Sequence, residues 1–174
     1  MLEQASEISK VTTNEVELLR AISVQTFTET FAQQNSENDM QKYVSENLSI
    51  EQLTKELNTV DSSFYFLKLN SDISGYLKLN RGNAQTELKN TNALEIERIY
   101  IKKEFQGKNF GAMLLLKSID IARAFKLQYI WLAVWEQNLK AIAFYKKHNF
   151  VEFDKHIFKL GDDEQIDIMM KLEL

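Results

Sequence analysis

The sequence contains no cysteine, no proline and only five glycines in its 174 residues. Without cysteine, the protein can form neither disulfide bonds nor thiolate metal sites, and covalent catalysis through an acyl-cysteine is excluded. The two histidines, His148 and His156, are too few for a histidine metal cage, so we expect no metal site. No apolar run approaches the roughly 20 residues that span a bilayer, and the polar start is unlike a signal peptide. These absences predict a cytoplasmic protein that does not enter membranes.

What is present is an ordinary globular composition, with 44% hydrophobic and 26% charged residues. A chain of 174 residues can bury one substantial core, and no linker-like stretch divides it, so we expect a single domain over residues 1–174. The formal net charge of -4 argues against nucleic-acid binding and leaves room for a small cationic substrate. A homodimer is possible, but the composition does not set the oligomeric state.

The pattern of apolar residues predicts a helical N-terminal part that is followed mainly by strands. After a short strand at 8–11, helices are expected over 15–33, around Met40 to Val44, and over 49–57. Strands at 64–69 and 73–79 form a hairpin, and the polar loop 82–92 is a candidate active-site rim. Further strands are expected at 94–101, 129–135, 151–160 and 166–174, and further helices at 110–126 and 138–149.

The stretch 94–126 combines a strand, a loop with two glycines and an apolar helix. Gly107 and Gly111 lie where backbone N–H groups can converge at the positive end of the helix dipole, which predicts a phosphate-binding loop. The loop has neither the Gly-Lys-Ser/Thr of a P-loop nor the three glycines of a dinucleotide fingerprint. Lys102, Lys103 and Lys108 surround it. A glycine-softened helix start on a solvated, charged surface is the alternative interpretation.

Two motifs in this sequence resemble those of the GNAT N-acetyltransferase superfamily. Its acetyl-CoA pyrophosphate loop has the pattern Gln/Arg-x-x-Gly-x-Gly/Ala, which Gln106, Gly111 and Ala112 match, with Asn109 in place of the first glycine. Its later pattern, Asn-x-x-Ala-x-x-Phe-Tyr…Gly-Phe, is matched by Asn138, Ala141, Phe144, Tyr145 and Phe150, with Asn149 in place of the glycine. Within the superfamily, the runs 26–31, 75–80, 98–101 and 130–136 look most like the PaiA-type spermidine/spermine N-acetyltransferases of bacteria.

The resemblance implies the GNAT acyl-CoA N-acyltransferase fold, a mixed α/β fold. A mostly antiparallel sheet of six to seven strands would be flanked by about four helices, and the strands at 94–101 and 129–135 would splay apart. The implied activity is transfer of the acetyl group of acetyl-CoA to a primary amine by direct attack in a ternary complex. The expected acceptor is a polyamine. Two alternatives stay open: another acceptor, such as a protein N-terminus, an amino acid or an aminoglycoside, or a non-catalytic acyl-CoA-binding sensor.

The resemblance also assigns residues to acetyl-CoA. The cofactor-binding residues it implies are Ile99, Tyr100, Ile101, Gln106, Gly107, Lys108, Asn109, Phe110, Gly111, Ala112, Asn138, Tyr145 and Lys147. In this assignment a backbone N–H of residues 99–101 stabilises the oxyanion, and the loop N–H groups hold the pyrophosphate.

Direct attack requires a neutral amine, and an alkylammonium with a pKa of about 10.4 is neutral in only about one molecule in a thousand at pH 7. A base acting through water would help, and Glu95 and Glu97 share one face of a strand by its period of two. The resemblance favours Glu97 over Glu95, although either could instead be a carboxylate paired with Arg98 or a lysine. It assigns Tyr145 as the acid that protonates the thiolate. The expected substrate-binding residues are Phe27, Phe31, Tyr43 and Glu29.

Overall fold

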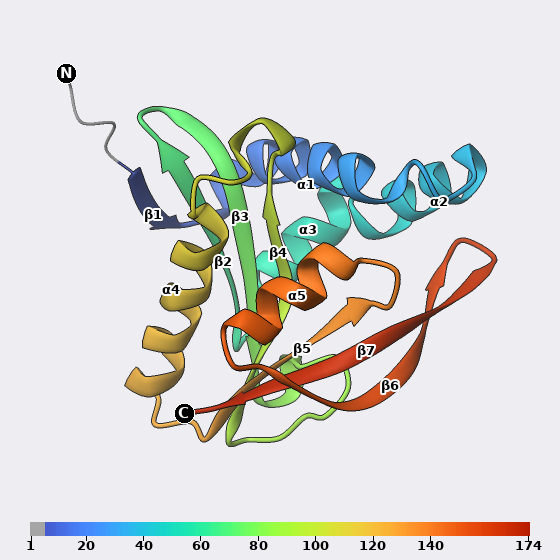
Figure 1. Cartoon of the computed structure of the whole chain (residues 1–174). Coiled ribbons are helices and arrows are strands. Elements are labelled where there is room, and N and C mark those ends of the chain that lie inside the picture. Colours follow the sequence, from blue (N-terminus) through green and yellow to red (C-terminus); the bar gives the residue numbers. More distant parts are fainter. Residues whose placement is uncertain (1–5) are drawn as a thin grey trace.

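The computed structural model describes residues 6–174, without the side chain of Phe158. The polar start that is unlike a signal peptide, and the first five residues of the predicted domain, lie outside this range. The described chain forms one seven-stranded sheet in the order β1-β2-β3-β4-β5-β7-β6, shown in Figure 1. The strands are β1 (Ser6–Lys10), β2 (Ser62–Leu69), β3 (Asp72–Arg81), β4 (Ala93–Ile101), β5 (Tyr129–Trp135), β6 (Val151–Leu160) and β7 (Asp163–Glu173).

Five α-helices are found among residues 6–174, as the pattern of apolar residues predicted, whereas the resemblance implied about four. They are α1 (Val16–Phe31), α2 (Glu37–Asn47), α3 (Ile50–Leu57), α4 (Phe110–Ala124) and α5 (Leu139–Lys147). Ser36 is the N-cap of α2, where its side chain accepts a hydrogen bond from Asp39 N, and Ser49 caps α3 in the same way by accepting from Gln52 N. These caps start α2 and α3 as separate helices. None of the helices in this part of the chain is long and apolar enough to cross a membrane.

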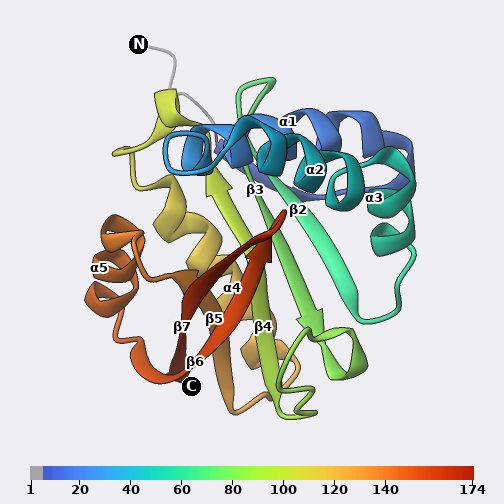
Figure 2. The ribbon, with the colours of Figure 1, turned by 90° about the vertical axis from the view of Figure 1, so that its right-hand side faces the viewer.

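The helices cover the two faces of the sheet in separate groups, which Figure 2 shows with α5 and α3 on opposite sides. Residues of α1 and α3 pack against alternate residues of β2 and β3, including Phe64, Phe66 and Tyr76. The other face carries Leu77, Leu94, Ile130 and their neighbours, which pack against α4 and α5. We call these the α1–α3 face and the α4–α5 face. Alternation along each strand therefore decides which helical layer a side chain meets.

The sheet opens between β4 and β5. These strands pair in parallel only where residues 93–95 meet residues 129–131, whereas every other pair of neighbouring strands is antiparallel. Beyond Glu95 and Trp131 the two strands share no ladder, so their edges separate. This confirms the predicted splay and leaves an opening that joins the two faces.

The tip of the β6–β7 hairpin closes against α2 on the α1–α3 face. Lys42 Nζ lies 3.0 Å from Asp162 Oδ1, and Asp162 N donates a hydrogen bond to Asp39 Oδ1 at 3.1 Å. Gly161 adopts a φ of +64°, and a Cβ there would lie 2.1 Å from Asp39 Oδ1, so the close approach requires glycine. The hairpin and α2 therefore bound one end of the opening between β4 and β5.

Candidate active site

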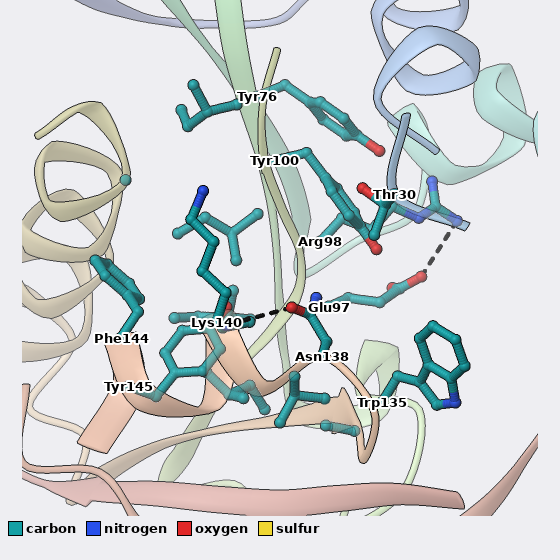
Figure 3. Close-up of a pocket in the computed structure, with 18 of the residues that line it drawn as sticks. Thr30, Tyr76, Glu97, Arg98, Tyr100, Trp135, Asn138, Lys140, Phe144 and Tyr145 are labelled. Atoms are coloured by element: carbon teal, nitrogen blue, oxygen red, sulfur yellow. Dashed lines mark hydrogen bonds and ion pairs between the residues drawn. The ribbon is translucent and has the colours of Figure 1, made fainter. Parts of the chain in front are cut away.

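A cavity of about 610 Å³ runs through the opening between β4 and β5. Its lining includes Glu97, Arg98 and Tyr100 of β4 on one side and Phe144 and Tyr145 of α5 on another, as Figure 3 shows. The cavity draws residues from both helical layers. One half belongs to the α4–α5 face and includes the glycine loop, and the other half belongs to the α1–α3 face.

The N-terminus of α4 has the groups that an anion needs. Its N-cap, Asn109, has a left-handed φ of 62° and makes no side-chain capping bond, whereas the N-cap side chains of α2, α3 and α5 all accept a backbone hydrogen bond. Along α4, Met113 is the first residue whose N–H donates a backbone hydrogen bond, and its acceptor is Asn109 O. In the described residues the N–H groups from Gly107 to Ala112 therefore have no protein acceptor, and they lie at the positive end of the helix dipole.

The space in front of this loop is open. Gly107 has a φ of +80°, and a Cβ built on it would meet no atom within 4 Å. A diphosphate can therefore approach the backbone there, and the residues fit the pyrophosphate of coenzyme A. Both asparagines that replace motif glycines have left-handed backbones, Asn109 with a φ of 62° and Asn149 with a φ of 66°. Asparagine tolerates this conformation better than other non-glycine residues, so both replacements keep the local backbone.

Side chains beside the loop fix its position. Gln106 Nε2 donates to Ile101 O at 3.2 Å, and Lys140 Nζ donates to Gln106 Oε1 at 2.8 Å. Lys140 and Lys147 line the cavity. Lys108, which we expected to contact the cofactor, is not part of the lining, and its Nζ lies 5.1 Å from the centroid of the Phe105 ring. The positive charge at this end therefore comes from α5 as well as from the loop.

Tyr145 lies on α5 with its ring in the core and its hydroxyl without a hydrogen-bond partner in the described residues. Burial raises the pKa of this hydroxyl above its ordinary value of 10, so Tyr145 stays protonated at neutral pH. Asn138 starts the helix, since its Oδ1 accepts a hydrogen bond from Ala141 N at 3.2 Å. The side chain of Asn138 is therefore committed to the helix start.

The other half of the cavity has an aromatic wall. The rings of Phe27 and Tyr43 stack with centroids 4.3 Å apart, and Phe31 lies 5.7 Å from Trp135. Phe27, Phe31 and Tyr43, which the sequence predicted to bind the substrate, thus line the cavity. Glu29 does not line the cavity: its carboxylate accepts hydrogen bonds from Lys103 N at 2.8 Å and Gln25 Nε2 at 2.9 Å. Residues two apart on a helix point in different directions, so Glu29 could not join Phe27 and Phe31.

Glu95 and Glu97 do share one side of β4, as predicted, and Asn80 Nδ2 donates to both carboxylates, at 3.0 Å and 2.6 Å. The ladder between β3 and β4 shifts register here, since Lys78 pairs with Arg98 and Leu79 pairs with Ile96. Glu97 is the unpaired residue of this β-bulge. The bulge places Glu97 and Arg98, although consecutive, on the same α1–α3 face.

Glu97 belongs to a buried network of four charges. Its carboxylate lies 2.6 Å from Lys78 Nζ and 3.3 Å from Arg98 Nη2. Glu56 of α3 completes the network with a bidentate pair to Arg98, at 2.9 and 3.1 Å, and a contact of 3.0 Å to Lys78. Burial by itself would raise the pKa of Glu97, but Arg98 and Lys78 outweigh burial, so that the pKa is lowered. Glu97 is therefore held as a carboxylate.

Glu95 has a different environment. It is only 3% exposed, and its carboxylate accepts hydrogen bonds from Thr86 N at 2.8 Å and from the Thr86 hydroxyl. Burial raises the pKa of Glu95, although the bonds from Thr86 and Asn80 act in the opposite direction. Of the two glutamates, Glu95 is thus the stronger proton acceptor.

Sequence reasoning missed several polar residues of the cavity wall. They include Thr86 in the predicted loop 82–92, Arg98 as a cavity residue, and Asp167 on β7, besides Thr30, Lys140 and His148. The expected position of the loop at the rim was the only signal for Thr86. Arg98 was considered only as a partner for a glutamate, and Asp167 lies in a strand whose alternating pattern looked ordinary.

Comparison with known proteins places this fold and site in a family. The sequence model described as the Acetyltransferase (GNAT) family matches residues 24–150. A protein of Lactobacillus delbrueckii subsp. lactis, named as an N-acetyltransferase in the pepI 3' region, is 41% identical over 154 residues, which cover 88% of this chain and 89% of that protein. The chain therefore belongs to the GNAT acetyltransferase family. This confirms the predicted enzyme class, an N-acetyltransferase that uses acetyl-CoA.

A sequence and a crystal structure from Thermoplasma acidophilum extend the comparison. A spermidine N(1)-acetyltransferase is 26% identical over 169 residues, which cover 95% of each protein. The crystal structure of PaiA N-acetyltransferase in complex with coenzyme A is similar with a TM-score of 0.80 at 24% identity, over 98% of this chain and 99% of that one. This structural similarity confirms the predicted fold.

Proposed function

We propose that this enzyme acetylates a primary amine of a polyamine such as spermidine or spermine. The observation that carries the proposal is the composition of the cavity on the α1–α3 face, where buried carboxylates lie beside an aromatic wall. Carboxylates and aromatic faces both attract ammonium groups, and the rings also pack against methylene chains. The spermidine N(1)-acetyltransferase among the relatives supports the same acceptor class.

In this proposal the α4–α5 face binds acetyl-CoA, which supplies an activated thioester. The free N–H groups from Gly107 to Ala112 hold the pyrophosphate, with Lys140 and Lys147 nearby. The separated edge of β4 at residues 99–101 pairs with the pantetheine arm and offers an N–H to the carbonyl oxygen. Asn138 supports this half indirectly, by fixing the start of α5.

The acceptor must lose a proton before it attacks, which for a free alkylammonium costs roughly 4 to 5 kcal/mol at pH 7. The resemblance favours Glu97 as the base, but Lys78 and Arg98 stabilise its ionised form. Burial instead raises the pKa of Glu95, and no cation lies within ion-pair distance of its carboxylate in the described residues. We therefore assign proton removal, through a water molecule, to Glu95 and the positioning of Arg98 to Glu97.

Tyr145 is the proposed acid. Its hydroxyl has no hydrogen-bond partner in the described part of the chain, lies on the cofactor side and remains protonated. It can donate its proton to the sulfur as the thiolate leaves. Because the amine proton and the thiolate proton are handled by different residues on opposite faces, Glu95 and Tyr145 should contribute separately to the pH profile.

The test is an acceptor screen in which release of the free thiol is followed and products are identified by mass spectrometry. The panel contains spermidine, spermine, 1,4-diaminobutane, 4-amino-1-butanol, an amino acid, an aminoglycoside and a peptide with a free N-terminus. We expect the polyamines to react fastest at low salt, with an advantage that shrinks as salt screens the attraction. Equal rates for 1,4-diaminobutane and 4-amino-1-butanol would exclude selection of a polycation. Binding of acetyl-CoA without thiol release from any amine would identify a sensor instead.

A further inference from the structure

One carboxylate of the cavity has no partner among the described residues. Asp167 of β7 lines the cavity and is 9% exposed. No residue in the described part of the chain donates a hydrogen bond to it or lies within ion-pair distance. Glu95 and Glu97, by contrast, accept hydrogen bonds or ion pairs from Asn80, Thr86, Lys78 and Arg98. A buried carboxylate without a partner is costly, so its retention here points to a group that arrives from outside.

Strand pairing shows which way Asp167 points. It lies directly opposite Trp135 of β5 and His156 of β6 in the antiparallel ladders, so the three side chains share the α1–α3 face. Trp135 is labelled in Figure 3, on the opposite side of the cavity from Tyr145. Asp167 therefore lies among the aromatic residues, two strands away from Glu95 in the sheet order.

The neighbouring charged groups of the protein do not neutralise Asp167. Lys78 and Arg98 are already matched by Glu56 and Glu97. His156 acts on Asp167 electrostatically, but its Nε2 lies 3.7 Å from Glu87 Oε1, and its Nδ1 is buried without a hydrogen-bond partner. Among the described residues, no cation of the protein therefore balances the negative charge of Asp167 on the α1–α3 face.

We propose that Asp167 binds the second ammonium group of a di- or polycationic acceptor while the reacting amine lies between Glu95 and the thioester. The spacer methylenes pack against the wall formed by Phe31 and Trp135. This assignment rests on the proposed polyamine acetylation, and it names the residue that would select a polycationic acceptor. Asp167 is then a specificity determinant, since it touches the substrate away from the reacting atoms.

The test compares wild type with Asp167→Asn on two acceptors of matched length, 1,4-diaminobutane and 4-amino-1-butanol. We expect the substitution to raise KM for the diamine at least tenfold with kcat within about threefold, because a charge-assisted hydrogen bond is lost. The amino alcohol, which has no second ammonium, should keep its kcat/KM within twofold. Asp167→Glu, which retains the charge, should recover part of the preference. Asp120→Asn, on an exposed position of α4, controls for the change in net charge.

Three results would overturn the assignment. An unchanged preference for the diamine in Asp167→Asn would mean that the second ammonium binds elsewhere. An equal loss on both acceptors would assign Asp167 to the chemistry or to folding, and a loss that disappears at high pH would mark it as a base.

A binding measurement separates this inference from the proposed reaction. Spermidine is titrated calorimetrically into wild type and Asp167→Asn in the presence of coenzyme A, which cannot react. If wild type binds spermidine without acetylating it, and the variant binds it at least tenfold more weakly, the assignment of Asp167 stands and the proposed reaction falls. If spermidine is acetylated with no dependence on Asp167, the reaction stands and the assignment falls.

Discussion

Replacing Asp167 by Asn should make the unliganded protein more stable at neutral pH. Burial raises the pKa of Asp167 from 3.8 to about 6, while His156 acts in the opposite direction. Between pH 4 and 6 the folded state therefore binds more protons than the unfolded state. By linkage, stability falls as the pH rises through this window, and the full cost of the ionised carboxylate is present above pH 6.

The size of this cost follows from the shift. A difference of about two pKa units, at about 1.4 kcal/mol each, gives an upper limit of about 3 kcal/mol at pH 7. Asparagine cannot ionise, so Asp167→Asn removes this cost while keeping the shape of the side chain. For a protein of this size, 1 kcal/mol corresponds to roughly 2–4 °C, so the variant should melt up to about 10 °C higher at pH 7.5. Near pH 4 the difference should fall to a small fraction of this value, because Asp167 is then neutral in the folded state and only about half ionised in the unfolded state.

Thermal unfolding followed by circular dichroism from pH 4 to 8 measures this effect. Wild type, Asp167→Asn and the control Asp120→Asn are compared at constant ionic strength, so that any change due to net charge alone appears in the control. The charged neighbours that could distort the profile are His156 on β6 and Glu87, which lies beside it. A variant that melts lower than wild type at pH 7.5, or a gain that does not depend on pH, would refute the idea that Asp167 is buried at a cost.

Four other substitutions test the remaining roles. Tyr145→Phe should lower kcat by about 10² at every pH from 6 to 9 and leave the Kd of acetyl-CoA nearly unchanged; a loss under threefold in stopped-time thiol assays would rule out the acid role. Glu95→Gln should also lower kcat by about 10² at pH 7, but this loss should shrink toward pH 10, where the amine is neutral. Glu97→Gln should instead lower the melting temperature, because Lys78 and Arg98 lose a buried partner. If Glu97→Gln rather than Glu95→Gln shows the pH-dependent loss, the base is Glu97. Gly111→Val should raise the Kd of acetyl-CoA at least tenfold. A Cβ added at Gly111 would lie 3.5 Å from the Phe144 ring, so the methyl groups of valine must project toward the ring or the pyrophosphate. An unchanged Kd by calorimetry would refute the loop assignment.

The cofactor half of the site could be predicted because its signal is local. Gly107, Gly111 and the strand before them lie close together in the sequence, and the backbone conformation that a phosphate loop requires restricts the residues that can occur there. The left-handed backbones of Asn109 and Asn149 follow from the same restriction. The splay between β4 and β5 was expected from the resemblance to the GNAT superfamily, since a parallel unit by itself predicts two strands that pair along their whole length.

The acceptor half could not be predicted in the same way because its contacts join distant parts of the chain. Arg98 meets Glu56 across 42 positions, and nothing near either residue indicates the pair. The bulge at Glu97 is not visible in the sequence either, since Glu-Ile-Glu-Arg reads as regular alternation. Asp167 can be recognised as a cavity residue only once the ladder between β5 and β7 places it beside Trp135. Glu29, however, could have been excluded from the helical period alone.

The groups that this fold leaves without partners follow a definite order through the cavity. The first are the N–H groups at the start of α4, which suit an anion. Next come the separated edges of β4 and β5, which lack a ladder beyond Glu95 and suit an amide-containing chain in extended form. Last is the carboxylate of Asp167, which suits a cation. Folded proteins rarely keep buried polar groups unsatisfied, so the order anion, amide chain, cation supports the ligands that we propose for the cavity. Coenzyme A joined end to end with a polycationic amine has this order of charges, whereas a neutral acceptor would leave Asp167 unmatched.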